Sequence, residues 1–176
     1  MTERVLPATV MRGGTSTGVF LRAEELPEAG PGRDRLLLAL MGSPDAMQIN
    51  GLGGTHSSTS KVMAVGASDE PGVDVDYLFA QVAVDDAIVD YQGNCGNLTT
   101  AIAPFAIDEG LVTVDPKANQ VVVMLRNLNT GVWIRASVPV KGGRSDAEGA
   151  LSIAGVPGTG PAITTDYLDP GGSVLG

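Results

Sequence analysis

Cysteine and histidine are nearly absent from this chain, which has one residue of each, Cys95 and His56. A single cysteine cannot form a disulfide within the chain, and these two residues cannot supply the four ligands of a structural zinc site. The folded state is therefore expected to depend on its apolar core alone.

Positive charge is also scarce, because 11 lysine and arginine residues stand against 20 aspartate and glutamate residues, giving a net charge of −9. No basic stripe is available to neutralise phosphate groups, so a nucleic-acid function is not expected. No apolar run approaches the ~18 residues of a membrane span. The N-terminus, MTERVLPATV, lacks the long apolar region of a signal peptide. We therefore expect a cytoplasmic protein that binds neither nucleic acid nor membrane.

Charged residues make up only 18% of the chain, whereas glycine and proline contribute 24 and 11 of the 176 residues. Coiled coils and helical bundles are rich in Glu, Lys and Leu, so this composition excludes them. The hydrophobic fraction of 43% excludes a disordered chain. At this length we expect about one domain, with many strands and tight turns and few helices.

Apolar residues alternate with other residues most clearly over 73–79 and 132–138, which predicts β-strands. Turn residues at 85–86 and at 127–131 each separate two apolar runs, a pattern typical of hairpins. We therefore expect a mostly antiparallel sheet. The shorter β-like runs are 5–11, 19–21, 61–65, 121–125 and, as a candidate last strand, 150–156.

Two segments have the pattern of helices. Residues 34–41 are short and apolar and end at a Gly-Ser-Pro stop signal. Residues 97–108 carry apolar side chains at helical spacing and few polar ones, which predicts a buried helix surrounded by strands. Pro104 lies inside this segment and is expected to kink the helix or to end its first part.

The first glycine-rich segment is 11–18, MRGGTSTG. Its glycine spacing is that of a phosphate loop, but Val19 and Phe20 stand where such a loop needs Lys and Ser or Thr. The segment is then either an ordinary turn between strands or a ligand loop. In a ligand loop, the glycines let the backbone approach closely and Thr15 and Ser16 donate to an anion.

The second glycine-rich segment is 51–61, GLGGTHSSTSK, in which His56 stands where a dinucleotide fingerprint needs glycine. Lys61 is one of only three lysines. It is either a solvated lysine at the start of a strand or a partly desolvated amine that can carry a proton. We interpret His56 as a hydrogen-bonding loop residue rather than as a catalyst.

The third segment, 93–98 with the sequence GNCGNL, lies just before the predicted buried helix. A helix N-terminus offers unpaired amides and a partial positive charge, which bind carboxylates and favour the thiolate of a cysteine located there. Free cysteine is usually an inert small apolar residue. Here the flanking glycines and asparagines favour a reactive Cys95.

Four stretches in this order and spacing resemble the PrpF family: MRGGTSTG, GLGGTHSSTSKV, DVDYLFAQVAV and GNCGNLTTAIAPFAI. This family contains methylaconitate and oxalomesaconate isomerases that are related in fold to diaminopimelate epimerase. The resemblance covers essentially the whole chain. It implies an α+β fold in which an antiparallel, barrel-like sheet wraps around a central helix, here the one that starts near Asn97.

The resemblance also implies an isomerase that moves a proton within a small unsaturated di- or tricarboxylate without metal or organic cofactor. The family's catalytic lysine falls on Lys61 and its active-site cysteine on Cys95. We assign Lys61 as main proton carrier and counter-charge, and Cys95 as second acid/base or as a positioning group. The residues expected to bind substrate are Arg12, Gly14, Thr15, Ser16, Ser60, Asn94, Gly96 and Asn97, although Arg12 could equally pair with an acidic residue.

Two departures from the family pattern stand out. Thr17 stands where many relatives carry lysine, so one cationic contact is missing and the substrate can differ. Family members are also two-domain proteins of roughly twice this length, with the active site between the domains. By this comparison residues 1–160 form the N-terminal domain only, and residues 161–176 form a crossover loop toward a second domain that this chain does not contain.

Several functions remain open at this point. The chain is either the N-terminal half of an isomerase, with little or no activity alone, or a non-catalytic carboxylate-binding or assembly domain derived from one. A homodimer is a third arrangement, in which the chain completes its own cleft. A cysteine hydrolase is disfavoured because His56 would have to be the partner base. A diaminopimelate-type epimerase needs a second cysteine, which the chain lacks.

Overall fold

The computed structural model describes residues 5–169, and one curled β-sheet connects most of them. The strands are β1 (Thr9–Gly13), β2 (Ser16–Arg22), β3 (Lys61–Ala67), β4 (Val75–Val82), β5 (Val89–Asp90), β6 (Gln120–Asn127), β7 (Trp133–Lys141), β8 (Arg144–Ser145) and β9 (Thr164–Leu168). The helices are α1 (Pro31–Met41) and α2 (Gly96–Asp108), with short 3-10 turns η1 (Ala23–Glu25) and η2 (Ser57–Thr59).

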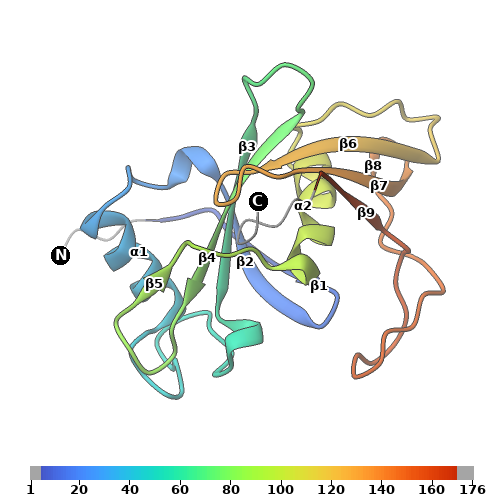
Figure 1. Ribbon diagram of the computed structural model, residues 1–176. Coiled ribbons are helices and arrows are strands. Elements are labelled where there is room, and N and C mark those ends of the chain that lie inside the picture. Colours follow the sequence, from blue (N-terminus) through green and yellow to red (C-terminus); the bar gives the residue numbers. More distant parts are fainter. Residues whose placement is uncertain (1–4, 170–176) are drawn as a thin grey trace.

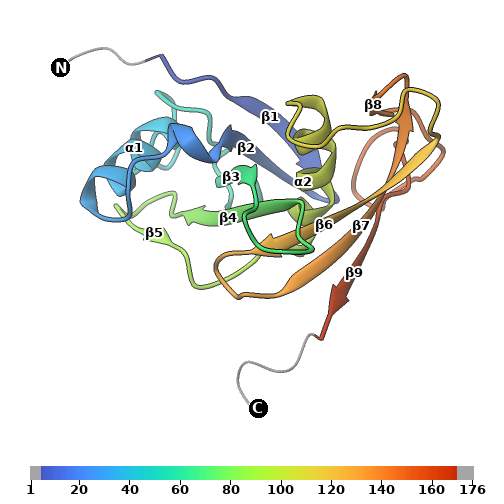
Figure 2. The same cartoon turned by 90° about the horizontal axis from the view of Figure 1, so that it is seen from above.

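The strands follow the order β1-β2-β3-β4-β6-β7-β8, with β5 added to β4 and β9 added to β7. Within the described part of the chain, only β2–β3 and β4–β6 pair in parallel. The expected mostly antiparallel sheet and both expected hairpins are therefore confirmed. In Figures 1 and 2 the strands follow one another around α2, which lies inside the curl. This arrangement confirms the expected α+β architecture.

The larger of two apolar clusters fills the space between α2 and the inner face of the sheet. Nine of the thirteen α2 residues are buried, and Ile102 and Phe105 pack there with side chains such as Phe20 of β2 and Tyr77 of β4. The helix does not end at Pro104, because its last residue is Asp108. Burial on all sides supports the helix at the point where proline removes a backbone hydrogen bond.

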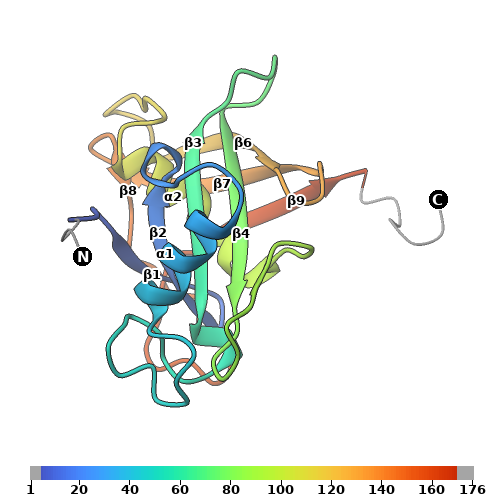
Figure 3. The ribbon, with the colours of Figure 1, turned by 90° about the vertical axis from the view of Figure 1, so that its left-hand side faces the viewer.

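The second apolar cluster lies on the outer face of the sheet, under α1. Alternate residues of the same strands supply it, so that Val62 of β3 faces α1 while its neighbour Met63 faces α2. Figure 3 shows α1 lying across β2, β3 and β4 on this outer side. Because both faces of these strands are covered, their register is strongly fixed.

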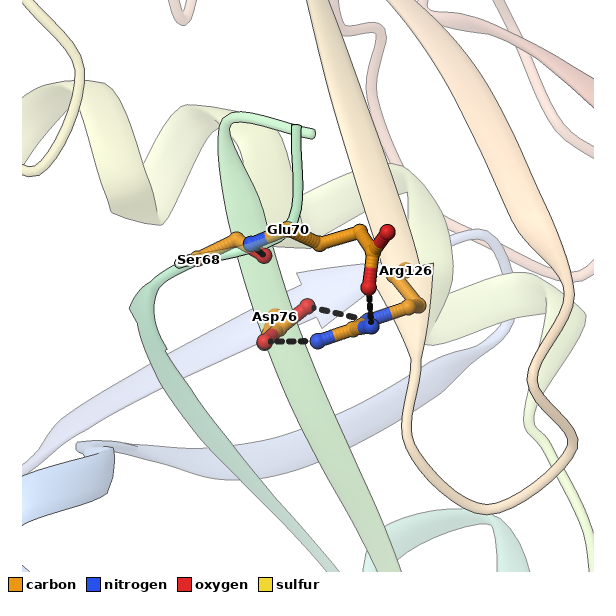
Figure 4. A network of polar contacts seen from close by, with 4 residues as sticks. All are labelled: Ser68, Glu70, Asp76 and Arg126. Carbon is orange, nitrogen blue, oxygen red and sulfur yellow. Dashed lines mark hydrogen bonds and ion pairs between the residues drawn. The ribbon is translucent and has the colours of Figure 1, made fainter. Parts of the chain in front are cut away.

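A charged network fastens the short parallel pairing of β4 with β6, which spans three residue pairs. Arg126 of β6 donates through Nε and Nη2 to both carboxylate oxygens of Asp76, its partner in the register, at 2.8 and 2.7 Å. Its Nη1 donates to Glu70 at 2.6 Å, and the Glu70 amide donates to Ser68 Oγ at 3.1 Å (Figure 4). A planar guanidinium that is held by two carboxylates resists slippage of one strand past the other.

Three local expectations differ from the structure. The first strand begins at Thr9 rather than at residue 5, after Pro7, which has no N–H to donate to a neighbouring strand. Residues 150–156 form no strand beyond a single bridge from Leu151 to Gly160. Within the expected crossover of 161–176, residues 164–168 form β9 against β7, and residues 170–176 lie outside the described part. The assignment of a crossover stays a prediction.

None of the helices within residues 5–169 combines the length and the apolar character that crossing a membrane requires.

Truncation of Ile102, which is fully buried between α2 and the sheet, is expected to test this core directly. We expect Ile102→Ala to lower the free energy of unfolding by about 2–5 kcal/mol, because it leaves a cavity against a rigid helix. Ile88→Ala is the matched control, since Ile88 is 58% exposed; its effect should stay within about 0.5 kcal/mol. Urea unfolding measures both, and equal losses would contradict the assignment of the core.

Candidate active site

A cavity of about 440 Å³ opens at the N-terminal end of α2. Its volume is within the usual range for small-molecule sites, about 300–1,000 Å³. Strands β2 to β5, the η2 turn and the loop before α2 all contribute to its wall. Of the residues predicted from the sequence, the cavity brings together Ser16, Lys61, Asn94, Cys95, Gly96 and Asn97.

Lys61 begins β3 and lies on the sheet face that also carries Met63, so its side chain extends toward α2. The residue is 9% exposed. Its Nζ donates to Oε1 of Gln81, its cross-strand partner, and lies 5.3 Å from the centre of the Phe79 ring. Burial lowers the pKa of Lys61 below its ordinary value, and negative charge on Cys95 raises it in part. The structure thus favours the desolvated amine over the solvated lysine.

Cys95 is the N-cap residue of α2 and is partly buried. Its Sγ donates to Ser16 Oγ across 3.7 Å. Its carbonyl accepts from both the amide and the hydroxyl of Thr99, each at 3.0 Å. The first turn of the helix carries no acidic residue, so the positive potential of the helix start is not neutralised within that turn. The thiol and the free helix amides therefore face one cavity.

Side-chain contacts fix the loop before α2 from both sides. Tyr77, buried in β4, donates to Asn94 Oδ1 at 3.2 Å. Asn97 Nδ2 donates to Thr15 Oγ1 at 3.0 Å in the turn between β1 and β2. Gly14 in that turn has a φ of +52°, and a Cβ there would lie 2.6 Å from Asn97 Oδ1. Only glycine allows this close approach without strain.

Four predicted substrate-binding residues lie outside this cavity: Arg12, Gly14, Thr15 and Ser60. Thr15 accepts from Asn97 in the β1–β2 turn. Arg12 and Gly14 line a second cavity of about 400 Å³ on the other side of the β1–β2 turn, where Arg12 Nη1 donates to the Gly14 carbonyl at 2.8 Å. Ser60 is fully buried, and its hydroxyl accepts from Gln48 at 2.7 Å. Thr17, where the family resemblance led us to expect a lysine, lies between Ser16 and Gly18 and points to the opposite face of β2 from Ser16.

The hydrogen bonds of the His56 side chain are to a residue of its own loop, Ser58. His56 caps η2 by accepting from the Ser58 amide through Nδ1 at 3.1 Å, and the same nitrogen lies 2.9 Å from Ser58 Oγ. It is not part of the lining of the cavity that contains Lys61 and Cys95. Within residues 5–169, no group of three or more His, Cys, Asp or Glu side chains is placed to hold a metal ion.

Six lining residues were not among those predicted from the sequence: Ser57, Ser58, Phe79, Gln81, Asp90 and Gly93. Ser57, Ser58 and Gly93 belong to the glycine-rich segments, whereas the other three lie outside them. Phe79 and Gln81 lie on the inner face of β4, and Asp90 is the β5 partner of Gln81. The residue types alone do not mark them as functional. The signal that could have found Gln81 is the register of the β3–β4 hairpin, which places it opposite Lys61.

The arrangement combines a buried amine, a thiol and a helix start around one opening. An amine with a lowered pKa is more readily neutral and can accept a proton and return it, and a helix start holds an anionic group such as a carboxylate. Proton transfer at a carboxylate-bearing molecule is the chemistry that these groups support together.

Comparison with known proteins gives a family match over residues 3–176, to the model described as PrpF protein. The chain is 44% identical to 3-methylitaconate isomerase of Eubacterium barkeri over 172 residues, and 46% identical to 4-oxalomesaconate tautomerase of Pseudomonas putida over 176 residues. These alignments cover 97% and 100% of this chain but 44% and 48% of the relatives.

A third relative is 2-methyl-aconitate isomerase of Cupriavidus necator, 44% identical over 94% of this chain and 44% of its own length. The crystal structure of methylitaconate-delta-isomerase superposes with a TM-score of 0.84 at 44% identity, covering 89% of this chain and 40% of that one. The expected epimerase-like α+β fold is thereby confirmed. The chain spans about half the length of the curated relatives it matches.

Gly14→Ala tests the close packing of the β1–β2 turn on α2. The new Cβ would lie on a left-handed backbone and against Asn97, so we expect a loss of more than about 1 kcal/mol in the free energy of unfolding. Gly32→Ala in α1 is the control, because a Cβ at that position meets nothing within 4 Å; its stability should be unchanged or slightly higher. Chemical denaturation measures the stability of both variants, and equal stability of Gly14→Ala and Gly32→Ala would contradict the turn geometry.

Proposed function

The chain belongs to the PrpF family, and from this membership we propose that its cavity serves a cofactor-independent isomerase. The reaction moves a proton within a small unsaturated di- or tricarboxylate. The relatives are named for methylitaconate, oxalomesaconate and 2-methyl-aconitate, which are all of this chemical class. The whole enzyme would include a second domain, to which residues 161–176 lead from the N-terminal domain of residues 1–160. A homodimer is the alternative way to close the cavity, and the cytoplasm is the proposed location.

The observation that carries this proposal is the meeting of Lys61 and Cys95 at one cavity. They lie 34 positions apart in the sequence, on β3 and at the start of α2, and both line the same opening. Each is close enough to the other that charge on Cys95 acts on the pKa of Lys61. A structural role would require neither a buried amine nor a thiol at an unneutralised helix start.

In the proposed reaction, the neutral amine of Lys61 removes a proton from a carbon next to a double bond. The electron pair left behind spreads through the conjugated system into a carboxylate and forms a dienolate. The proton then returns to a different carbon from Lys61 or from Cys95, so the double bond moves and no atom is gained or lost. The enzyme's task is to stabilise the negative charge as it develops.

Two anchoring points for the substrate follow from the geometry. The exposed amides of Gly96 and Asn97 at the helix start suit one carboxylate. The hydroxyl of Ser16 beside the thiol, with Thr15 next to it, suits a second. Since Arg12 lines another cavity, Lys61 supplies the main positive charge at this opening once it has taken up the proton.

Calorimetry with methylitaconate tests whether the cavity binds such a carboxylate. We expect Lys61→Ala to weaken binding about tenfold or more, because it removes a charged hydrogen-bond donor worth roughly 1.5–3 kcal/mol. Lys141→Ala, at the exposed end of β7, removes the same charge elsewhere and should leave binding unchanged. Failure of the chain to bind, or equal weakening in the two variants, would contradict the proposal.

A further inference from the structure

The amide of Gln81 has all its principal hydrogen-bonding groups engaged at the edge of the candidate site. Its Oε1 accepts from Lys61 Nζ. Its Nε2 donates to the carbonyl of Ser60 at 2.9 Å and to the carbonyl of Ser57 at 3.1 Å. A reversed amide would place Oε1 against two carbonyl oxygens, which are acceptors only. The orientation of this amide is therefore set by the backbone of the η2 turn and the residue that follows it.

The sheet fixes the distance between Gln81 and Lys61 as well. The two residues are direct partners in the antiparallel pairing of β3 with β4. Facing Cβ atoms in such a pair lie about 4.5–5.5 Å apart. Neighbouring residues on both strands are buried on both faces, so neither side chain can move by a slip of register.

The groups around the Lys61 amine include little fixed negative charge. From β4, the amine meets the neutral Gln81 amide and the Phe79 ring. The titratable groups in the lining are Cys95 at the start of α2 and Asp90 on β5, and Asp90 Oδ1 already accepts from the Gln92 amide at 2.8 Å. β2 and η2 contribute serines to this lining.

We propose that Gln81 is a positioning residue, whose locked amide aims the Lys61 amine into the cavity without supplying a counter-charge. An amide oxygen accepts one N–H from either protonation state of the amine. When the amine is neutral, it must still turn an N–H toward Gln81, which leaves its lone pair free to face the cavity. A carboxylate in the same place would instead stabilise the ammonium and reduce the fraction of base.

The claim that this positioning helps Lys61 to transfer a proton rests on the proposed function. The effect of Gln81 on the pKa of Lys61 does not. The chain has three lysines, at positions 61, 117 and 141, so ¹³C-lysine labelling gives few resonances to resolve. Lys61→Arg identifies the resonance of Lys61. Titration of that resonance reports the pKa of the amine without any substrate.

We expect Gln81→Glu to raise the pKa of Lys61 and Gln81→Leu to lower it further. The glutamate adds a negative charge beside the ammonium, whereas leucine removes its hydrogen-bond acceptor. A merely structural disturbance would move both variants in the same direction. Gln120→Glu adds the same charge at the exposed start of β6 and should leave the titration unchanged.

Opposite shifts in the two Gln81 variants, with none in Gln120→Glu, support the proposal. Shifts in the same direction, or a shift in Gln120→Glu of equal size, overturn it. Thermal unfolding shows whether each variant is folded. If the carboxylate of Gln81→Glu next to the Ser57 and Ser60 carbonyls prevents folding, Gln81→Leu still tests the proposal, because it places no charge there. If the shifts occur but Lys61→Ala still binds methylitaconate as wild type does, positioning stands and the proposed isomerase fails.

Discussion

An apolar helix without an exposed face has to be enclosed by other elements, and α2 imposes this requirement on the whole chain. Its buried residues contact strands from both halves of the sheet, so the sheet must curl instead of lying flat (Figure 2). The parallel pairing of β4 with β6 fits the same requirement. The chain passes through α2 between β4 and β6, and the Arg126–Asp76 ion pair stabilises the pairing of these two strands. Gly96 and Asn97, the two exposed residues of α2, both lie in its first turn.

This enclosure also allows a chain of net charge −9 to attract an anion locally. A protein with this charge repels polyanions at long range, so attraction has to be concentrated at short range. The start of α2 and the Lys61 amine meet at one cavity, and desolvation there strengthens their effect. The same burial lowers the pKa of Lys61, which connects binding of an anion with the ability to move a proton.

The sequence predicts the parts of the site that depend on residue type and on local pattern. The segment at 97–108 and the strand that begins at Lys61 lie close to their expected bounds, and Lys61 meets Cys95 because both flank the central helix. The parts of the site that depend on which strand residues face one another could not be predicted from the sequence. Ser60 and Lys61 are neighbours in sequence, but alternation turns Ser60 away toward Gln48. Gln81 is recognised as a site residue only from its pairing with Lys61. Arg12 is the β1 partner of Thr17 and so lies on the opposite face from Ser16, where it lines a different cavity from Lys61.

The proposed chemistry depends on one step, in which Lys61 takes a proton from a carbon of a substrate whose carboxylate is held at the start of α2. Incorporation of solvent deuterium into methylitaconate, followed by NMR in the presence of the chain, measures this step even where net conversion is small. We expect exchange above the blank, increasing as pH rises through the lowered pKa of Lys61, because only the neutral amine is a base. We also expect Lys61→Ala to reduce this exchange by about 100-fold or more, whereas Lys141→Ala should retain it. Exchange that is absent, or equal in the wild type and Lys61→Ala, would contradict the account.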